Sequence, residues 1–323
     1  MTMAASPPDA AALAPGQVDR LLRQLEWTVL RRLHGQLQGD YRTWLRGSGI
    51  DLADLREYQP HDDVRHIDWN VTARQHTPYV RVFHEDREMS TWFVLDLSGS
   101  ASFGSGRMRK SSLAQAFVGV LARLLVGHGN RVGALLFGQG KPTPRMLRPR
   151  NGRQQVLQLM QAMAPAVAGT QPGGRTQLGP WLLATGAVAR QRSTVIVVSD
   201  FVCETDWPHA LGQLARRHDV VAVRLFDPLE QQMPELGVLN FRDAETGETL
   251  LVDTHDARWR ARFAQLAATR ETALRQAFGA AGVDTLELST EGDLADALLR
   301  FDHMRRQRAG QTVGPARPLP RAA

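Results

Sequence analysis

The sequence has little cysteine and little lysine. Its one cysteine, Cys203, cannot form a disulfide within the chain, and no group of cysteines and histidines has the spacing of a zinc site. Only Lys110 and Lys141 are lysines, so nearly all of the 39 basic residues are arginines. A single cysteine is typical of a protein kept in a reducing compartment, and we expect a cytoplasmic chain.

The sequence also lacks a long hydrophobic run. The longest stretch without charge, residues 154–174, contains five glutamines, two prolines and three glycines, and the apolar run 116–126 is interrupted by Arg123. Neither offers the roughly 18–20 apolar residues that a membrane-spanning helix needs. The first 16 residues have no basic start and no leucine-rich core, so we expect a disordered leader there and no signal peptide.

The composition is that of a globular protein with a sizeable core. The chain has 323 residues, of which 43% are hydrophobic and 22% charged, and this length predicts about two domains that need no disulfide or metal to fold. The net charge is +6, but residues 303–323 alone contribute five arginines and no acid. Because the basic charge is concentrated in this tail, specific binding to nucleic acid is not expected.

From residue 90 onward, short apolar strands alternate with amphipathic helices. The main predicted strands are 92–97, 132–137, 194–199, 220–226 and 285–288, with a short strand near Met146 and a hairpin of 238–241 and 249–252. The predicted helices are 109–126, 152–163, 178–190, 208–217, 256–279 and 292–306. This alternation predicts an α/β fold with a doubly wound, mostly parallel sheet that helices cover on both faces.

The region before this alternation has a different composition. Apolar residues at helical spacing predict a helix over 17–32, and residues 39–88 hold ten acids and seven arginines. We expect this charged segment to be irregular and to end in a strand at 79–84. The predicted parts of the chain are therefore a disordered leader at 1–16, an N-terminal helix and segment at 17–87, an α/β domain at 88–305, and a disordered, arginine- and proline-rich tail at 306–323.

Carboxylate and hydroxyl side chains follow two of the predicted strands. Asp96 ends the first apolar strand, and Ser98 and Ser100 follow it at alternating positions; Asp200 comes directly after a later strand. In parallel sheets the carboxyl ends of strands meet at one edge, where ligands bind. Thr176, after two glycines, adds a hydroxyl there, although it could instead cap the following helix. Such hard oxygen ligands suit Mg²⁺ or Mn²⁺.

This arrangement of residues resembles the metal-ion-dependent adhesion site of von Willebrand factor A domains. The resemblance implies that Asp96, Ser98, Ser100 and Thr176 bind one Mg²⁺ or Mn²⁺ directly or through water, with Asp200 in support. In that family the metal keeps a position open for a carboxylate from a protein partner. The resemblance therefore implies a von Willebrand A-like domain and a non-enzymatic, metal-dependent role in protein–protein interaction.

A second motif precedes the sheet. Residues 55–69 read LREYQPHDDVRHIDW, and Thr-Ala-Arg follows at 72–74. The segment resembles the signature REYxPGDDxRxIDWxxxAR of bacterial domain-of-unknown-function family fifty-eight, except that His61 stands where that family has glycine and residues 50–53 lack the usual Phe-x-Gly. The two resemblances together cover residues 35–300. They imply a partnership with a MoxR-type AAA+ ATPase, as an adaptor or co-chaperone in the assembly or maturation of protein complexes.

The charged residues of this motif alternate in sign, which indicates arginine–carboxylate ion pairs. Such pairs either fix an irregular segment or form a docking surface, and the two roles are compatible. The candidate docking residues are Arg56, Tyr58, Asp62, Asp63, Arg65, Asp68, Trp69 and Arg74.

Two other interpretations of the chain stay open, and a third, a phosphate-binding loop, is disfavoured. A Mg²⁺-dependent hydrolase or phosphotransfer enzyme could use the same site with a water or phosphate at the metal, although no base or nucleophile accompanies the site in the sequence. A structural oligomer could retain the site without its metal. Residues 104–111, GSGRMRKS, follow a strand and open a helix as a phosphate-binding loop does, but Arg109 stands where the Walker pattern needs glycine.

Overall fold

The computed structural model describes residues 52–59, 64, 67–75, 77–83, 90–106, 108–138, 141–167, 176–203, 207–242 and 248–312. The leader and the helix predicted at 17–32 lie outside these residues. Near the N-terminus, β1 (Leu52–Glu57) pairs antiparallel with β2 (Tyr79–Phe83), and α2 (Trp69–Gln75) lies between them in the chain. The predicted strand at 79–84 is confirmed, whereas the prediction of irregular structure before it was wrong for β1 and α2.

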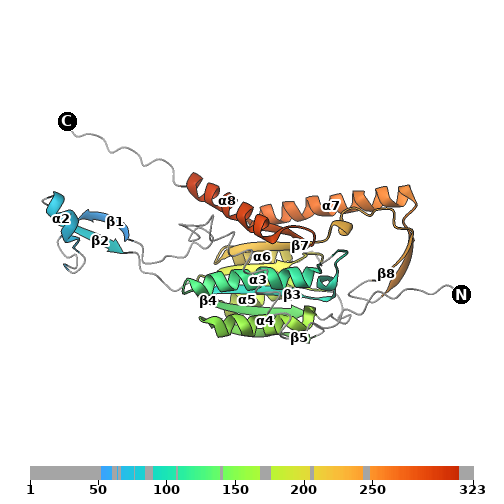
Figure 1. Cartoon of the computed structure of the whole chain (residues 1–323), viewed down its shortest axis with the longest axis horizontal. Helices are drawn as coiled ribbons and strands as arrows, with labels where there is room; N and C mark the ends of the chain where they lie inside the picture. The colour runs from blue at the N-terminus through green and yellow to red at the C-terminus, as the bar shows by residue number, and fades with distance from the viewer. Residues whose placement is uncertain are drawn as a thin grey trace.

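Six strands form the central sheet in the order β10-β7-β6-β3-β4-β5 (Figure 1). Their bounds are Ser90–Leu97 for β3, Arg131–Gly138 for β4, Lys141–Arg150 for β5, Thr194–Ser199 for β6, Asp219–Phe226 for β7 and Asp284–Ser289 for β10. All neighbours are parallel except β4 and β5. The chain first builds outward from β3 to β5 and then returns to the other side of β3 with β6, so the strand order switches between β3 and β6.

Helices cover both faces of the sheet. One core layer contains α3 (Lys110–Gly127), α4 (Arg153–Val167) and α8 (Leu294–Thr312), and the other contains α5 (Leu178–Val188), α6 (Trp207–Ala215) and α7 (Ala257–Ala281). Successive side chains of a strand point to opposite faces. Accordingly, Phe93 and Leu95 of β3 belong to the first layer, and Trp92 and Val94 to the second. The predicted doubly wound α/β fold is confirmed.

Helix α3 is the most apolar long helix of the described chain. It has the length and mean hydropathy, 1.2, of a membrane-spanning segment, but 72% of this window is buried inside the protein. Leu113, Phe117 and Leu121 are all at most 4% exposed in the first core layer. A helix that is covered on nearly all sides needs this apolar composition to form a core.

The element boundaries differ from the prediction mainly at two places. Strand β5 is ten residues long although it contains Pro142, Pro144 and Pro149, which an edge strand tolerates because one side of its backbone needs no partner. Helix α8 extends to Thr312, so the prediction of a disordered tail was wrong for residues 306–312. Arginine, glutamine and alanine in this stretch favour helix.

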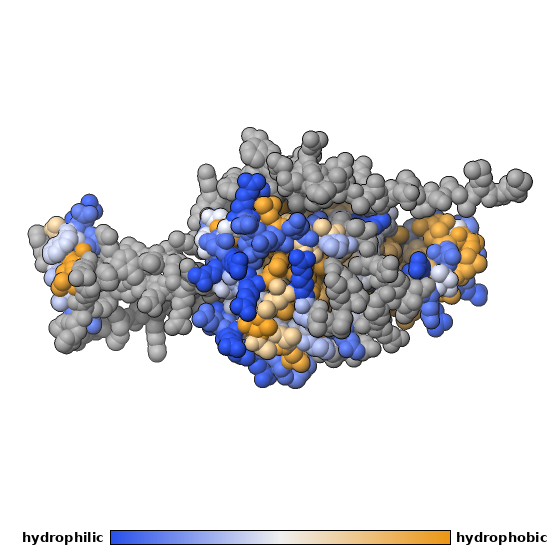
Figure 2. Space-filling model, turned by 90° about the horizontal axis from the view of Figure 1, so that it is seen from below, coloured by the Kyte–Doolittle hydropathy of each residue, from blue (hydrophilic) through white to orange (hydrophobic). Residues whose placement is uncertain are grey.

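A hairpin lies beyond the sheet at the start of α7. Strands β8 (Val238–Arg242) and β9 (Thr249–Asp253) pair antiparallel, as predicted. The buried Thr254 fastens the base of the hairpin, because its hydroxyl donates to Gly237 O at 2.6 Å and accepts from Leu236 N at 2.8 Å. Leu250 and Leu251 remain 65% and 71% exposed, and Figure 2 shows hydrophobic residues at this end of the molecule.

Gly138 ends β4 beside the loop that follows β3. Its φ angle is +93°, and a Cβ atom at this position would lie 2.6 Å from both Leu97 C and Ser98 N. No side chain fits so close to a backbone, so glycine lets β4 pack against the loop that carries the candidate serine ligands.

We therefore expect Gly138→Ala to destabilise the protein by at least about 2 kcal/mol more than Gly129→Ala. Gly129 also has a positive φ, +81°, but its Cβ would meet no atom within 4 Å. Both variants have the cost of a positive φ at alanine, so the difference between them measures the cost of the close contact between a Cβ at position 138 and the backbone of residues 97 and 98. Urea unfolding of both variants measures the difference, and equal losses would contradict a tight contact at Gly138.

Candidate metal centre

The switch in strand order places two predicted ligands at one edge of the sheet. Asp96 lies near the end of β3, and Asp200 follows β6 directly. The two strands are parallel neighbours, with Leu95 opposite Val198. The Ser199 hydroxyl donates to Asp96 Oδ2 at 2.7 Å, so a hydrogen bond joins the two strand ends. The edge of the sheet that topology favours for a ligand thus carries Asp96 and Asp200 together.

The loop after β3 brings its two serines next to each other. Ser98 N donates to Asp96 Oδ1 at 3.0 Å, and the Ser98 and Ser100 hydroxyl oxygens lie 3.0 Å apart. A short 3-10 helix, η3 (Gly99–Ser102), begins directly after Ser98. One buried carboxylate and two hydroxyls therefore converge, as the Asp-x-Ser-x-Ser pattern predicts.

Thr176 is half-buried and lies two residues before α5. The N-cap position of α5 is Gln177, whose side chain makes no capping hydrogen bond. The two glycines before Thr176 lie outside the described residues. The role of Thr176 as a metal ligand stays a prediction.

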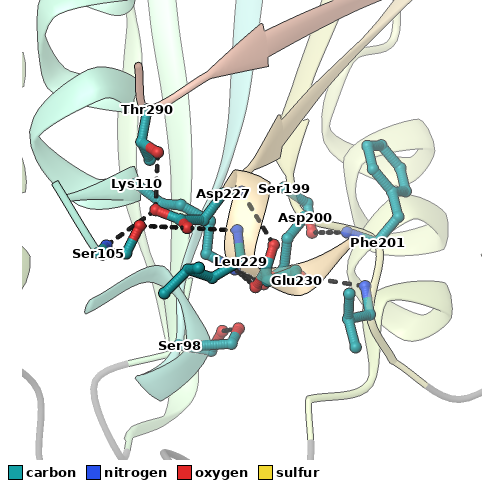
Figure 3. Close-up of polar contacts among 12 residues, drawn as sticks. Ser98, Ser105, Lys110, Ser199, Asp200, Phe201, Asp227, Leu229, Glu230 and Thr290 are labelled. Carbon is teal, nitrogen blue, oxygen red and sulfur yellow. Dashed lines mark hydrogen bonds and ion pairs between the residues drawn. The ribbon is translucent and has the colours of Figure 1, made fainter. Parts of the chain in front are cut away.

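The site also contains a buried lysine, Lys110, which the sequence motifs did not identify. Lys110, the first residue of α3, is only 1% exposed. Its Nζ donates to Asp200 Oδ2 at 2.8 Å and to Glu230 Oε1 at 2.7 Å (Figure 3). Lys110 belongs to the segment that imitates a phosphate-binding loop, but its ammonium group binds two carboxylates of the protein. A lysine at the start of an apolar helix was the available signal, because a buried lysine needs acidic partners.

The carboxyl groups of Asp96 and Asp200 have different electrostatic environments. Burial raises the pKa of Asp96 to about 6, with a further rise from the charge of Asp200, although hydrogen bonds from Ser199 and Ser98 oppose this. Burial also acts to raise the pKa of Asp200, but the Lys110 ammonium group and further hydrogen bonds lower it below the usual range. Asp96 therefore holds the less stabilised charge of the pair.

A third strand-end carboxylate, Asp227, orders the neighbouring loops. It is fully buried at the end of β7 and accepts hydrogen bonds from Ser105 N at 2.9 Å, Ser105 Oγ at 2.6 Å and Thr290 Oγ1 at 2.7 Å. Its backbone N–H donates to Glu230 Oε2 at 3.0 Å in a capping box of the 3-10 helix η4 (Pro228–Glu230). Burial opposes ionisation of Asp227, yet these hydrogen bonds lower its pKa. Asp227 is thus fully satisfied by the protein (Figure 3).

The charges at this edge fit a divalent cation. Asp96, Asp200 and Glu230 carry three negative charges when ionised, and Lys110 carries one positive charge. One divalent ion beside Asp96 would neutralise the remaining two negative charges, and the nearby hydroxyls are ligands that Mg²⁺ accepts. The described residues contain no group of three or more histidine, cysteine or acidic side chains placed to hold a metal. The candidate centre is therefore one of few carboxylates and several hydroxyls.

The N-terminal motif contributes a separate candidate surface. Asp68 is 8% exposed, and its Oδ1 accepts from Asn70 N at 3.0 Å and Val71 N at 3.2 Å. These hydrogen bonds cap α2. The next residue, Trp69, is 69% exposed. A rigid cap thus holds a large aromatic side chain in solvent.

The other motif residues are distributed around this short unit. Arg56 lies in β1, and the backbone N–H of Tyr58 donates to Pro78 O at 2.8 Å. Arg74 is exposed in the last turn of α2. Asp62, Asp63 and Arg65 lie outside the described residues.

The family of the chain follows from the sequence comparison. The family model described as "Protein of unknown function DUF58" matches residues 54–273, which include most of the motif segment, the metal loop and most of the sheet. The chain belongs to the DUF58 family. The uncharacterized protein Rv1480 of Mycobacterium tuberculosis is 35% identical to this DUF58 protein over 291 residues, which cover 89% of this chain and 90% of the relative. The uncharacterized protein MAV169 of Mycobacterium avium is 31% identical over 160 residues, 50% of this chain and 94% of the relative.

Solved structures with a related chain trace have low sequence identity to this DUF58 protein. BatB from Bacteroides thetaiotaomicron is 15% identical with a TM-score of 0.42, over 68% of this chain and 99% of that chain. The SpRpn10 VWA domain is 12% identical with a TM-score of 0.39, over 66% of this chain and 94% of that chain. The strand order and the two helix layers themselves define the fold described above.

The raised pKa of Asp96 predicts an effect on stability in protein freed of metal by EDTA. The pKa rises from 3.8 to about 6 in the folded protein, so ionisation of Asp96 opposes folding as the pH rises from about 4 to 6. Across this range we expect the free energy of unfolding of wild type to fall by up to about 3 kcal/mol relative to that of Asp96→Asn. Denaturant unfolding at several pH values measures it.

Asp253→Asn is the control for this pH series. Hydrogen bonds from His255 lower the pKa of Asp253, so its titration affects stability only below about pH 4. If the free energies of unfolding of wild type and Asp96→Asn changed in parallel between pH 4 and 6, the raised pKa of Asp96 would be refuted.

Proposed function

We propose that this DUF58 protein is a non-enzymatic, metal-dependent protein-binding module. The observation that supports it best is the buried Asp96 carboxylate beside the paired Ser98 and Ser100 hydroxyls, at the point where the strand order switches. The excess negative charge at this edge supports the binding of a cation there. A site with so few charged ligands suits recognition, because the ion would keep affinity for a further anionic ligand.

In this proposal Asp96, Ser98, Ser100 and Thr176 hold Mg²⁺ or Mn²⁺, and Asp200 supports them. When bound, the ion supplies an open position that a carboxylate of a partner protein fills. Asp96 supplies charge and the two serines supply neutral oxygen ligands. The hydrogen bond from Ser199 to Asp96 and the pairing of Lys110 with Asp200 hold the carboxylates in place.

The partner that we propose is a MoxR-type AAA+ ATPase in the cytoplasm, with this protein as its adaptor or co-chaperone in the assembly or maturation of protein complexes. Membership of the DUF58 family and the motif around residues 55–74 support this choice. The capped and exposed Trp69 offers an apolar contact of the kind that protein interfaces favour.

Metal binding predicts a stability increase that depends on Asp96. At about 100 times the dissociation constant, Mg²⁺ should stabilise wild type by roughly 2.7 kcal/mol and Asp96→Ala by much less. Thermal unfolding with Mg²⁺ and with EDTA measures this. Asp253→Ala, which removes an exposed carboxylate from β9, should respond as wild type does. An equal response of wild type and Asp96→Ala would exclude this metal centre.

The proposal predicts that partner binding requires both Mg²⁺ and Asp96. Purified wild type should capture the purified cognate MoxR-type ATPase in Mg²⁺ but not in EDTA, and Asp96→Ala should fail in both. Trp69→Ala should weaken capture while leaving the Mg²⁺ stabilisation intact, because Trp69 belongs to the separate motif surface. Capture that ignores Mg²⁺ and Asp96 would refute the proposal, as would Mg²⁺-dependent phosphatase or nuclease turnover that Asp96→Ala abolishes.

A further inference from the structure

Lys110 is buried deeply enough for its charge to act on the candidate metal centre. It is 1% exposed and contacts Asp200, one of the predicted supporting residues, at 2.8 Å. Its second partner, Glu230, is fixed by the backbone N–H of Asp227. The Nζ atom also lies 5.9 Å from the centre of the Phe103 ring. Contacts from three sides therefore fix the position of this cation.

A purely structural role explains this arrangement poorly. Removing charged groups from water is unfavourable, and well-packed apolar side chains of similar volume often replace a whole buried ion pair without loss of stability. The side chains of α3 in the first core layer are apolar, but an apolar residue in place of Lys110 alone would leave Asp200 buried without a counter-charge. The charge itself is the property that an apolar residue could not supply.

We propose that Lys110 is the internal counter-charge that allows the metal centre to accept an anionic ligand, the carboxylate of a partner protein. The inference rests on the proposed metal-dependent function and adds a residue that determines which ligand the metal takes. Lys110 acts through Asp200 and the local charge, so it is a positioning residue that touches neither metal nor partner.

The charge balance gives the reason. With Lys110, the three carboxylates and a divalent ion sum to zero, so an arriving carboxylate meets no net repulsion. Without Lys110, the same group would already carry one negative charge, and a second anion would be repelled in a buried site where charges are poorly screened. The lysine therefore lowers the affinity for the metal but raises the affinity for the anion.

A series of three variants changes this charge stepwise. Lys110→Met makes the metal-free group one unit more negative, Glu230→Gln makes it one unit less negative, and the double variant has the same charge as wild type. Mn²⁺ affinity is measured by calorimetry. Carboxylate binding is measured as Mn²⁺-dependent broadening of the NMR signal of ¹³C-labelled acetate.

The two affinities should change in opposite directions. Relative to wild type, Lys110→Met should bind Mn²⁺ about tenfold more tightly and acetate about tenfold more weakly, and Glu230→Gln should show the reverse. The double variant should restore most of the acetate binding. If Lys110→Met acted only through loss of packing, it would weaken the binding of Mn²⁺ and of acetate together, and adding Glu230→Gln would not restore either.

Arg131→Met is the matched control, because Arg131 starts β4 at the opposite edge of the sheet and its loss changes the overall charge equally. It should leave both affinities unchanged. Thermal unfolding of each variant confirms that it is folded, and Glu230→Gln alone tests the predicted direction if Lys110→Met does not fold. If every variant binds Mn²⁺ and acetate binding is unchanged across the series, the role of Lys110 is refuted but the proposed function is not. A wild type that binds no Mn²⁺ would refute the proposed function and this role with it.

Discussion

The edge of the sheet that carries the candidate metal ligands depends on one buried ammonium group. Lys110 joins the start of α3 to Asp200 after β6 and to Glu230 in η4, three segments far apart in the chain. A buried lysine is tolerated only with such partners, and Asp200, which is 5% exposed, would be buried without a counter-charge if the lysine were removed. The ion pairs therefore fix α3 relative to the strand ends. The loop between β3 and α3, which carries the candidate serine ligands, is held at both of its ends as a result.

Three aspartates at neighbouring strand ends look alike in the sequence but are stabilised in different ways. Asp227 accepts hydrogen bonds from Ser105, Thr290 and the backbone, which lower its pKa and leave it no free capacity. Asp200 is stabilised mainly by the charge of Lys110. Among the residues that the structure describes, Asp96 accepts hydrogen bonds from a hydroxyl and a backbone N–H, and its pKa is raised. The protein thus supplies a counter-charge for Asp200 and leaves Asp96 as the carboxylate that gains most from a cation.

The sequence predicted those features that local pattern and parallel topology determine. The apolar strands β3 and β6 were identified by their composition, and a parallel sheet necessarily brings Asp96 and Asp200 to one edge. Strand β1 and helix α2 were missed because β1 contains alanine and acids that strands disfavour, and α2 is only seven residues long with no buried face. The ion pair of Lys110 with Glu230 was not predictable, because it joins residues 120 positions apart and depends on how η4 packs.

Natural sequences satisfy local physical rules nearly everywhere and violate them mainly where function requires it. Most buried polar groups at this edge obey the rules, since Asp227 has a full set of donors and Asp200 has its ammonium partner. Asp96 does not, because burial removes its carboxylate from water and its contacts in the described residues include no cation. An asparagine at position 96 would avoid this cost because its amide is neutral. The sequence nevertheless has a carboxylate there, beside two hydroxyls that need no counter-charge of their own. A divalent ion at this position would stabilise the carboxylate that carries this unfavourable energy.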